Sequence, residues 1–270
     1  MTHRLSLQGV GKSFDTLTVL ENLSLHVETG EFVSILGPSG AGKSTLFQIL
    51  TSAINHDAGQ IAFDGAPLTH SQDKFAFMPQ RDALMPWRRI IDNATLGLEV
   101  QGASRAEARK RVLPLLDQFG LKGFENHYPA QLSGGMRQRV ALLRTVVQER
   151  KMLLLDEPFG ALDALTRTSM QRWLEGMWER HRWTALLITH DIREAIYLSD
   201  RIYVLSQRPA QVVREIRVPL PRRRNFSDLN SAAATKIEAE LLAALIEPDA
   251  AGQSPAADQD FATPIPTRHY

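Results

Sequence analysis

Apolar and polar residues alternate in two stretches near the start of the chain. Leucine or valine recurs at every second or third position from residue 5 to 10, and at every second position from residue 23 to 27. A period of two places apolar side chains on one face of a β-strand. The pattern therefore predicts two strands in this region, with a turn at 29–31 leading into the next element.

Further along, short apolar runs are bounded by polar or turn residues, as is typical of buried strands. These runs are 32–36, 75–80, 152–155 and 185–188. Helical patterns lie between them: Leu46, Ile49 and Leu50 recur at helical spacing after the first run, and residues 81 to about 150 are mostly helical, interrupted by Pro114. Alternating strands and helices predict an α/β fold with a mostly parallel sheet covered on both faces.

Ligands of such sheets bind at the carboxyl ends of the strands. Gly37, Gln80, Asp156 and His190 each lie at the end of one of the apolar runs or just after it. We therefore expect these four residues to lie along one edge of the sheet.

The patterns weaken after about residue 208. Residues 212–218 alternate like a strand, 219–224 form a proline and arginine turn, and 238–246 are expected to form a short helix. Residues 248–270 contain too few apolar side chains to pack, and we expect them to be disordered.

Composition narrows the class of protein. The 270 residues are 43% hydrophobic and 23% charged, with a net charge of +1 and no cysteine. This near-neutral balance argues against a dedicated nucleic-acid binder, and the lack of cysteine excludes a disulfide framework or a thiolate metal site. No apolar run approaches the eighteen or so residues of a membrane span, and residues 1–4 lead into a strand pattern instead of a signal-peptide core.

One stretch matches the phosphate-binding pattern G-x-x-x-x-G-K-[ST]. It consists of Gly37, Pro38, Ser39, Gly40, Ala41, Gly42, Lys43, Ser44 and Thr45. Glycines let successive backbone N–H groups point at phosphate oxygens, and the following helix adds its positive N-terminal dipole. Lys43 is expected on the β- and γ-phosphates and Ser44 on Mg²⁺. The alternative, a glycine-rich turn without chemistry, does not explain the strand before it and the helix after it.

Two adjacent carboxylates, Asp156 and Glu157, follow an apolar strand run. Buried carboxylates are costly unless they meet a cation, which nucleotide-bound Mg²⁺ would supply. Asp156 is the candidate metal ligand. Glu157, one residue further on, is the candidate general base or water-orienting residue for hydrolysis.

Ser133, Gly134 and Gly135 stand directly before a helix pattern. This geometry is typical of anion binding, although Ser133 acting only as a helix cap explains it equally simply. A second phosphate-type helix start in one chain is explained if two chains form a dimer.

Phe14 is an aromatic residue in a predicted turn at 11–14. It is a candidate for stacking on a nucleotide base, and capping the hydrophobic core is an equally weighted alternative.

The chain as a whole resembles the nucleotide-binding subunit of an ATP-binding cassette (ABC) transporter. Besides the P-loop and the acidic pair, Leu132 to Gly135 match that family's signature and Gly160 to Asp163 its D-loop. Gln80 matches its Q-loop and His190 its switch histidine. The order and approximate spacing agree from about Leu5 to Arg208.

This resemblance implies a fold and a dimeric site. The fold is that of a RecA-like P-loop NTPase with an N-terminal antiparallel β subdomain, and the family domain spans 1–208 with a helical signature subdomain inserted at about 86–150. Residues 209–247 form a C-terminal extension. Two chains pair head to tail, and each ATP is bound by the P-loop of one chain and by Ser133 and Gly135 of the other.

The resemblance also assigns roles to single residues. Phe14 becomes the adenine platform, and Gln80 contacts Mg²⁺ and the attacking water. His190 contacts the γ-phosphate, and Asp163 crosses the dimer interface.

A narrower resemblance links residues 84–93, Arg208-Pro209 and 218–222 to bacterial importers of nitrate, taurine, alkanesulfonates or thiamine-precursor pyrimidines. Ala210 departs from that group, which commonly has glycine there. Trp87 is either an exposed anchor in the groove that receives a membrane partner or a buried aromatic residue of the helical subdomain.

The implied protein is an ATP-hydrolysing importer subunit with ATP and Mg²⁺ as cofactors. Its implied partners are a second copy, two transmembrane permease subunits and, indirectly, a solute-binding protein, at the cytoplasmic face of the inner membrane. Alternatives are a non-transport cassette ATPase acting on DNA or ribosomes and an export motor. Adenylate kinase or GTPase chemistry explains neither 133–135 nor His190. The cargo is not encoded in this chain.

Overall fold

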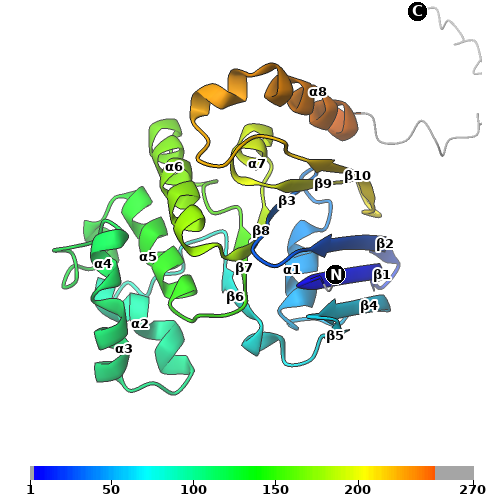
Figure 1. Ribbon diagram of the computed structural model, residues 1–270. Coiled ribbons are helices and arrows are strands. Elements are labelled where there is room, and N and C mark those ends of the chain that lie inside the picture. Colours follow the sequence, from blue (N-terminus) through cyan, green and yellow to red (C-terminus); the bar gives the residue numbers. More distant parts are fainter. Residues whose placement is uncertain (1–2, 247–270) are drawn as a thin grey trace, which may run out of the picture.

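A computed structural model of the chain describes residues 3–246, which form two sheets and the helices that pack against them (Figure 1). The smaller sheet is antiparallel, with strand order β2-β1-β4-β5. Its strands are β1 (Leu5–Phe14), β2 (Leu17–Val27), β4 (Ala58–Phe63) and β5 (Ala66–Pro67). The two N-terminal strands predicted from alternation are thereby confirmed.

The predicted turn at residues 11–14 is wrong. These residues are the end of β1, and Phe14 pairs with Leu17 in a hairpin whose turn is Asp15-Thr16. Asp15 has a φ of 50°, a left-handed conformation that aspartate tolerates better than most residues. The strand therefore continues to Phe14 because cross-strand pairing with β2 extends it.

The larger sheet has the strand order β10-β9-β3-β8-β7-β6. Its strands are β3 (Phe32–Leu36), β6 (Phe75–Met78), β7 (Met152–Asp156), β8 (Thr184–Ile188), β9 (Arg201–Leu205) and β10 (Val212–Arg217). All neighbouring pairs are parallel except β9 and β10, whose short connection permits only an antiparallel pair. The mostly parallel sheet is confirmed, while β9 has no counterpart among the predicted strands.

Both faces of this sheet are buried. In β3, Val33 and Ile35 pack in one apolar cluster with helix α1 (Lys43–Leu50) and the antiparallel sheet. Phe32 and Leu36 point to the opposite side and pack in a second cluster with α6 (Ala164–His181) and α7 (Ile192–Leu198). Burial on both faces explains why these strands have continuous apolar runs instead of alternation.

The helical region predicted between 81 and 150 lies to one side of the sheet (Figure 1). It contains α2 (Ile90–Val100), α3 (Arg105–Val112), α4 (Leu115–Gln118) and α5 (Gly134–Val146). Pro114 separates α3 from α4, as predicted, because proline cannot donate a helix-interior hydrogen bond.

The C-terminal part packs onto the sheet and α7. Helix α8 (Ala232–Ile246) begins earlier than the predicted 238, because Ser231 caps it and an alanine run supplies strong helix formers. Arg224, which is buried, donates to the carbonyls of Ile196, Tyr197 and Ser199 and so satisfies the C-terminal end of α7. The predicted disorder of 248–270 concerns residues outside the described range.

Among residues 3–246, no helix is both long and apolar enough to cross a bilayer.

Candidate nucleotide-binding site

The predicted phosphate loop connects the carboxyl end of β3 to the amino end of α1 (Figure 1). Gly40 and Gly42 have φ values of 79° and 101°, in the left-handed region that favours glycine. A Cβ added at Gly42 would lie 2.8 Å from a methyl carbon of Val19 in β2. Both glycines are therefore required by backbone conformation, and Gly42 also by the close approach of β2.

Lys43 is the first residue of α1, and its side chain returns to the loop. Its Nζ donates to the carbonyls of Gly37, at 2.7 Å, and Pro38, at 2.8 Å. Burial lowers the pKa of Lys43, while Glu157 and Asp156 oppose that shift. The ammonium group is thus held inside the loop, with acidic groups nearby that favour its charged form.

The acidic pair lies at the end of β7. Burial, reinforced by repulsion from Glu157, raises the pKa of Asp156 to about 6, and the charge of Lys43 only partly offsets this. A partly buried carboxylate with an incompletely compensated charge is the environment in which a bound cation is favourable. Its oxygen donors suit a hard ion such as Mg²⁺.

The side chain of Glu157, just after β7, contacts residues that follow the two neighbouring strands. Its Oε2 accepts a hydrogen bond from Gln80 Nε2 at 3.0 Å and lies 3.3 Å from His190 Nδ1. Gln80 follows β6 and His190 follows β8, on either side of β7. The expectation that these polar residues share one edge is confirmed, because parallel neighbours end at the same edge of the sheet.

These residues border a cavity of about 600 Å³. Its lining is Ser39, Gly40, Gly42, Lys43, Ser44, Thr45, Gln80, Glu157, His190 and Arg208. A surface groove of about 770 Å³ between β6 and α2 is larger, but the groups suited to phosphate chemistry line the smaller cavity. Among the lining residues in the described range, only Arg208 has no predicted site role, although it belongs to the Arg208-Pro209 pair that resembles the importer subgroup.

Ser133 and Gly135 lie elsewhere in the same chain. Ser133 caps α5, its Oγ accepting from the Met136 N–H at 3.3 Å. Together with Thr166 they line a separate hollow of about 330 Å³, and within the described residues this hollow shares no lining residue with the phosphate-loop cavity. One chain therefore does not bring its two phosphate-type helix starts together.

Asp163 borders the same region. Its Oδ1 accepts from the N–H groups of Leu165, at 3.1 Å, and Thr166, at 3.0 Å, which makes it the N-cap of α6. A helix cap of this kind fixes the start of α6 beside the hollow that Ser133 lines.

Two aromatic alternatives are resolved by exposure. Phe14 is 43% exposed at the end of β1, with Lys12 Nζ 5.3 Å from its ring centre, so it does not cap the core. Trp87 is 72% exposed, so it is not a buried residue of the helical subdomain. Both rings are accessible to a ligand or partner.

Comparisons with known proteins agree with this geometry. Residues 20–160 match the family model described as "ABC transporter". A formylaminopyrimidine import ATP-binding protein, ThiZ, from Halalkalibacterium halodurans is 43% identical over 85% of this chain and 90% of its own length. An aliphatic sulfonates import ATP-binding protein, SsuB, from Yersinia pestis is 41% identical over 90% of this chain and 86% of its own length.

The chain belongs to the ABC transporter family. Its fold agrees with a solved structure titled as the dimeric structure of MJ0796, a bacterial ABC transporter cassette, with a TM-score of 0.69, 33% identity, and coverage of 80% of this chain and all of that one. A second structure of the same cassette, 32% identical with the same TM-score and coverage, is described as a post-hydrolysis state bound to ADP and Pi. This ABC protein accordingly binds ATP and hydrolyses it, on a RecA-like P-loop fold.

One departure from the importer subgroup has a simple structural explanation. Ala210, where that group commonly has glycine, is fully buried and is not among the residues with positive φ. Alanine adopts its backbone conformation without strain, so the departure leaves the loop intact.

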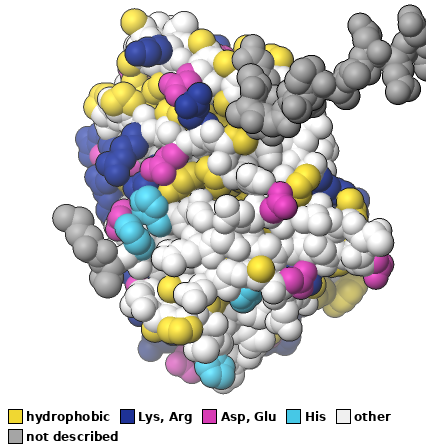
Figure 2. Space-filling view, turned by 90° about the vertical axis from the view of Figure 1, so that its right-hand side faces the viewer, with side chains coloured by type: hydrophobic (Ala, Val, Ile, Leu, Met, Phe, Trp, Pro, Cys, Tyr) yellow, Lys and Arg dark blue, Asp and Glu magenta, His cyan; other side chains and the backbone are white. Residues whose placement is uncertain are grey.

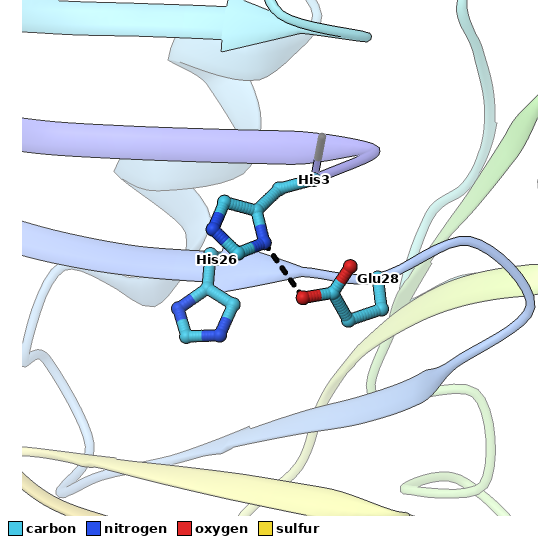
Figure 3. A group of neighbouring side chains, drawn as sticks. All are labelled: His3, His26 and Glu28. Atoms are coloured by element: carbon cyan, nitrogen blue, oxygen red, sulfur yellow. Dashed lines mark hydrogen bonds and ion pairs between the residues drawn. The ribbon is translucent and has the colours of Figure 1, made fainter. Parts of the chain in front are cut away.

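A histidine cluster in this ABC protein lies away from the nucleotide site. On the side seen in Figure 2, basic side chains lie beside acidic ones and histidines. His3, His26 and Glu28 come within 4.8 Å of one another, and His3 Nδ1 is 2.7 Å from Glu28 Oε1 (Figure 3). However, the Arg201 guanidinium contacts Nε2 of His26, and both burial and that charge lower the pKa of His26. A fixed positive charge against the imidazole disfavours a metal ion, so we interpret the cluster as a hydrogen-bond network.

Sequence reasoning missed a buried carboxyl in the helix that follows His190. Glu194, in α7, accepts a hydrogen bond from Gln171 Nε2 in α6 at 2.8 Å. Burial raises its pKa to about 7, Asp191 adds to the shift, and hydrogen bonds from Thr189 and Gln171 and the charge of Arg167 oppose it. The sequence signal for this residue is its spacing from Asp191, since Asp-x-x-Glu is a helix-start pattern, and Asp191 Oδ1 accepts from the Glu194 N–H at 3.0 Å.

We expect this carboxyl to make folding stability depend on pH. Because the folded state holds the Glu194 proton up to about pH 7 whereas the unfolded chain loses it near 4.5, wild-type stability should fall as pH rises between these values. Glu194→Gln should remove that slope. The difference in melting temperature, variant minus wild type, should therefore increase by about 5 °C from pH 5 to pH 8. Thermal melts across this range test it, and parallel curves for the two proteins would contradict it.

Proposed function

We propose that this chain is the motor subunit of a bacterial ABC importer, coupling ATP binding and hydrolysis in a head-to-tail dimer to the uptake of a small solute. The observation that carries the proposal is the contact of Glu157 with Gln80 and His190 beside the phosphate loop. The proposed solutes are of the nitrate, sulfonate, taurine or pyrimidine kind, and identities of 41–43% to import subunits for sulfonates and a formylaminopyrimidine support the sulfonate and pyrimidine classes.

Within this proposal, the P-loop residues 37–45 hold the triphosphate of ATP. Ser44, Gln80 and Asp156 would provide oxygen ligands for Mg²⁺, which suit a hard cation. The positive charge of the ion would favour the ionised form of Asp156, whose pKa is otherwise raised. When bound, the ion neutralises charge on the β- and γ-phosphates. Glu157 accepts the proton of the attacking water, Gln80 and His190 orient the water and the γ-phosphate, and Phe14 stacks on the adenine.

The phosphate loop and the Ser133 region border separate cavities within one chain, and this separation supports a dimer. Ser133, Gly134 and Gly135 of one chain would meet the phosphates held by the partner, with Asp163 at the interface. ATP then bridges two chains when the dimer is closed and contacts only one when it is open, so nucleotide favours closure by differential binding. This difference in binding is what would move the membrane subunits.

In this proposal, a segment of a permease subunit binds in the groove between β6 and α2. The groove is lined by Phe75, Phe77, Leu96 and Val100 among others, and the exposed Trp87 lies just before α2. A groove with mixed apolar and polar lining next to an exposed aromatic side chain is suited to binding a protein segment. Two transmembrane permease subunits would hold the dimer at the cytoplasmic face of the inner membrane, and a solute-binding protein would be an indirect partner of this chain.

We assign the motor to residues 1–208, with the helical subdomain at about 86–150, and treat 209–247 as an extension. The extension adds β10 to the sheet and caps α7 through Arg224, which supports a role in bracing the segment that presents His190.

Uptake assays test the proposal. We expect a strain lacking this gene to lose uptake of one class among nitrate, sulfonates, taurine and pyrimidines, and to regain it with the wild-type gene but not with Glu157→Gln. Unchanged uptake of the whole panel, together with purification of the protein with ribosomes or DNA, would instead support the non-transport alternative.

A further inference from the structure

We infer that Arg208 is a second cationic contact for the phosphate groups of the nucleotide, in addition to Lys43. The inference rests on the nucleotide site proposed above and adds a residue from a distant loop to it. Arg208 lines the same cavity as Lys43, Gln80, Glu157 and His190, although it is separated from the phosphate loop by most of the chain.

The loop that carries Arg208 is anchored next to the phosphate loop. Ala210 N–H donates to the Val19 carbonyl at 2.9 Å, and Glu21 N–H donates to the Ala210 carbonyl at 3.1 Å. Val19 is also the residue against which Gly42 packs. One segment of β2 therefore supports both loops, which fixes Arg208 before a ligand arrives and lowers the entropy cost of using it.

The guanidinium group is placed for anion binding. Its Nε donates to the Gly40 carbonyl, and its Nη2 lies 3.5 Å from the position that a Cβ on Gly40 would occupy. Since a guanidinium carries five N–H donors, four remain after the bond to Gly40. Their fork geometry matches phosphate oxygens, which a lysine meets only as a point charge.

Arg208 also lacks the partner that occupies many other arginines of the chain. Arg201 pairs with Glu31 and Arg222 with Asp200, whereas within residues 3–246 no carboxylate lies in ion-pair distance of Arg208. Lys43 donates to the carbonyls of Gly37 and Pro38. An exposed, unpaired arginine beside a phosphate loop retains the donors and charge that a phosphate group would use.

The test is nucleotide affinity measured by titration calorimetry on the full chain with Mg²⁺, using ATP and ADP. We expect Arg208→Gln to weaken both affinities by about tenfold, within the range for a hydrogen bond to a charged group, and to reduce their dependence on salt. Arg208→Lys, which keeps the charge but not the fork of donors, should recover part of the affinity and the salt dependence. Arg214→Gln is the matched control. Arg214 is an exposed arginine of β10 that does not line the cavity, so its substitution removes the same charge at a distance from the nucleotide site.

Two outcomes would overturn the inference. Wild-type affinity in Arg208→Gln excludes the contact, and equal losses in Arg208→Gln and Arg208→Lys with unchanged salt dependence would assign Arg208 only to bracing Gly40. Lys43→Ala separates this inference from the proposed site. If Lys43→Ala abolishes binding while Arg208→Gln does not change it, only the role of Arg208 fails, whereas normal binding by Lys43→Ala would reject the site itself. Circular dichroism melts confirm that each variant is folded.

Discussion

Glu157→Gln is expected to lower ATP hydrolysis by about 10²- to 10⁴-fold, the range for losing a general base. The amide keeps the size of the side chain and an oxygen that can still accept from Gln80, so the phosphate loop and Lys43 are left in place. ATP should therefore still bind. Because hydrolysis no longer resets the dimer, the variant should accumulate as a nucleotide-bound dimer.

Turnover by purified protein, ATP binding by calorimetry and gel filtration with ATP measure these three properties together. Glu240→Gln, an exposed carboxylate on α8, is the control and should behave as wild type. A variant that remains monomeric with ATP and hydrolyses it at the normal rate would show that Glu157 is not the base.

The second large effect is expected from mixing two inactive variants. Lys43→Ala removes the cation of the phosphate loop, and Ser133→Arg places a bulky side chain where the partner's phosphates would lie. Each variant alone should lose nearly all hydrolysis. A mixture should recover about a quarter of wild-type activity, since half of randomly paired head-to-tail dimers are mixed and each of these keeps one intact site.

This experiment separates a shared site from a complete site in one chain. Activity should return only on mixing and should depend on protein concentration. If Ser133→Arg by itself turns over ATP at the wild-type rate, then each chain contains a whole site and the head-to-tail dimer is wrong. The two separate hollows, one at Lys43 and one at Ser133, are the structural reason to expect the first result.

Sequence patterns predicted the elements that depend on local physics. The phosphate loop was predictable because its chemistry lies in consecutive backbone groups, and the observed φ values of Gly40 and Gly42 explain the glycines. The break at Pro114 follows from one missing donor. The strands at 32–36 and 152–155 were evident because burial on both faces requires continuous apolar residues.

Patterns failed where contacts between distant segments decide the outcome. The strand ending at Phe14 continues because β2 pairs with it, and β9 is strand because β3 and β10 flank it. In both cases tertiary pairing overrides a weak local preference. The early start of α8 is different, because the Ser231 cap and the alanine run that follows it are local signals in the sequence.

The sequence by itself determined the family, the phosphate loop and the order of the candidate catalytic residues, because spacing along the chain carries that information. Only the tertiary structure decided that Gln80, Glu157 and His190 meet within hydrogen-bonding or ion-pair distance, that Phe14 and Trp87 are exposed, and that Arg208 joins the phosphate cavity. The reason is that exposure and contact depend on how the sheet brings strand ends together, and no local pattern records which distant residues then become neighbours.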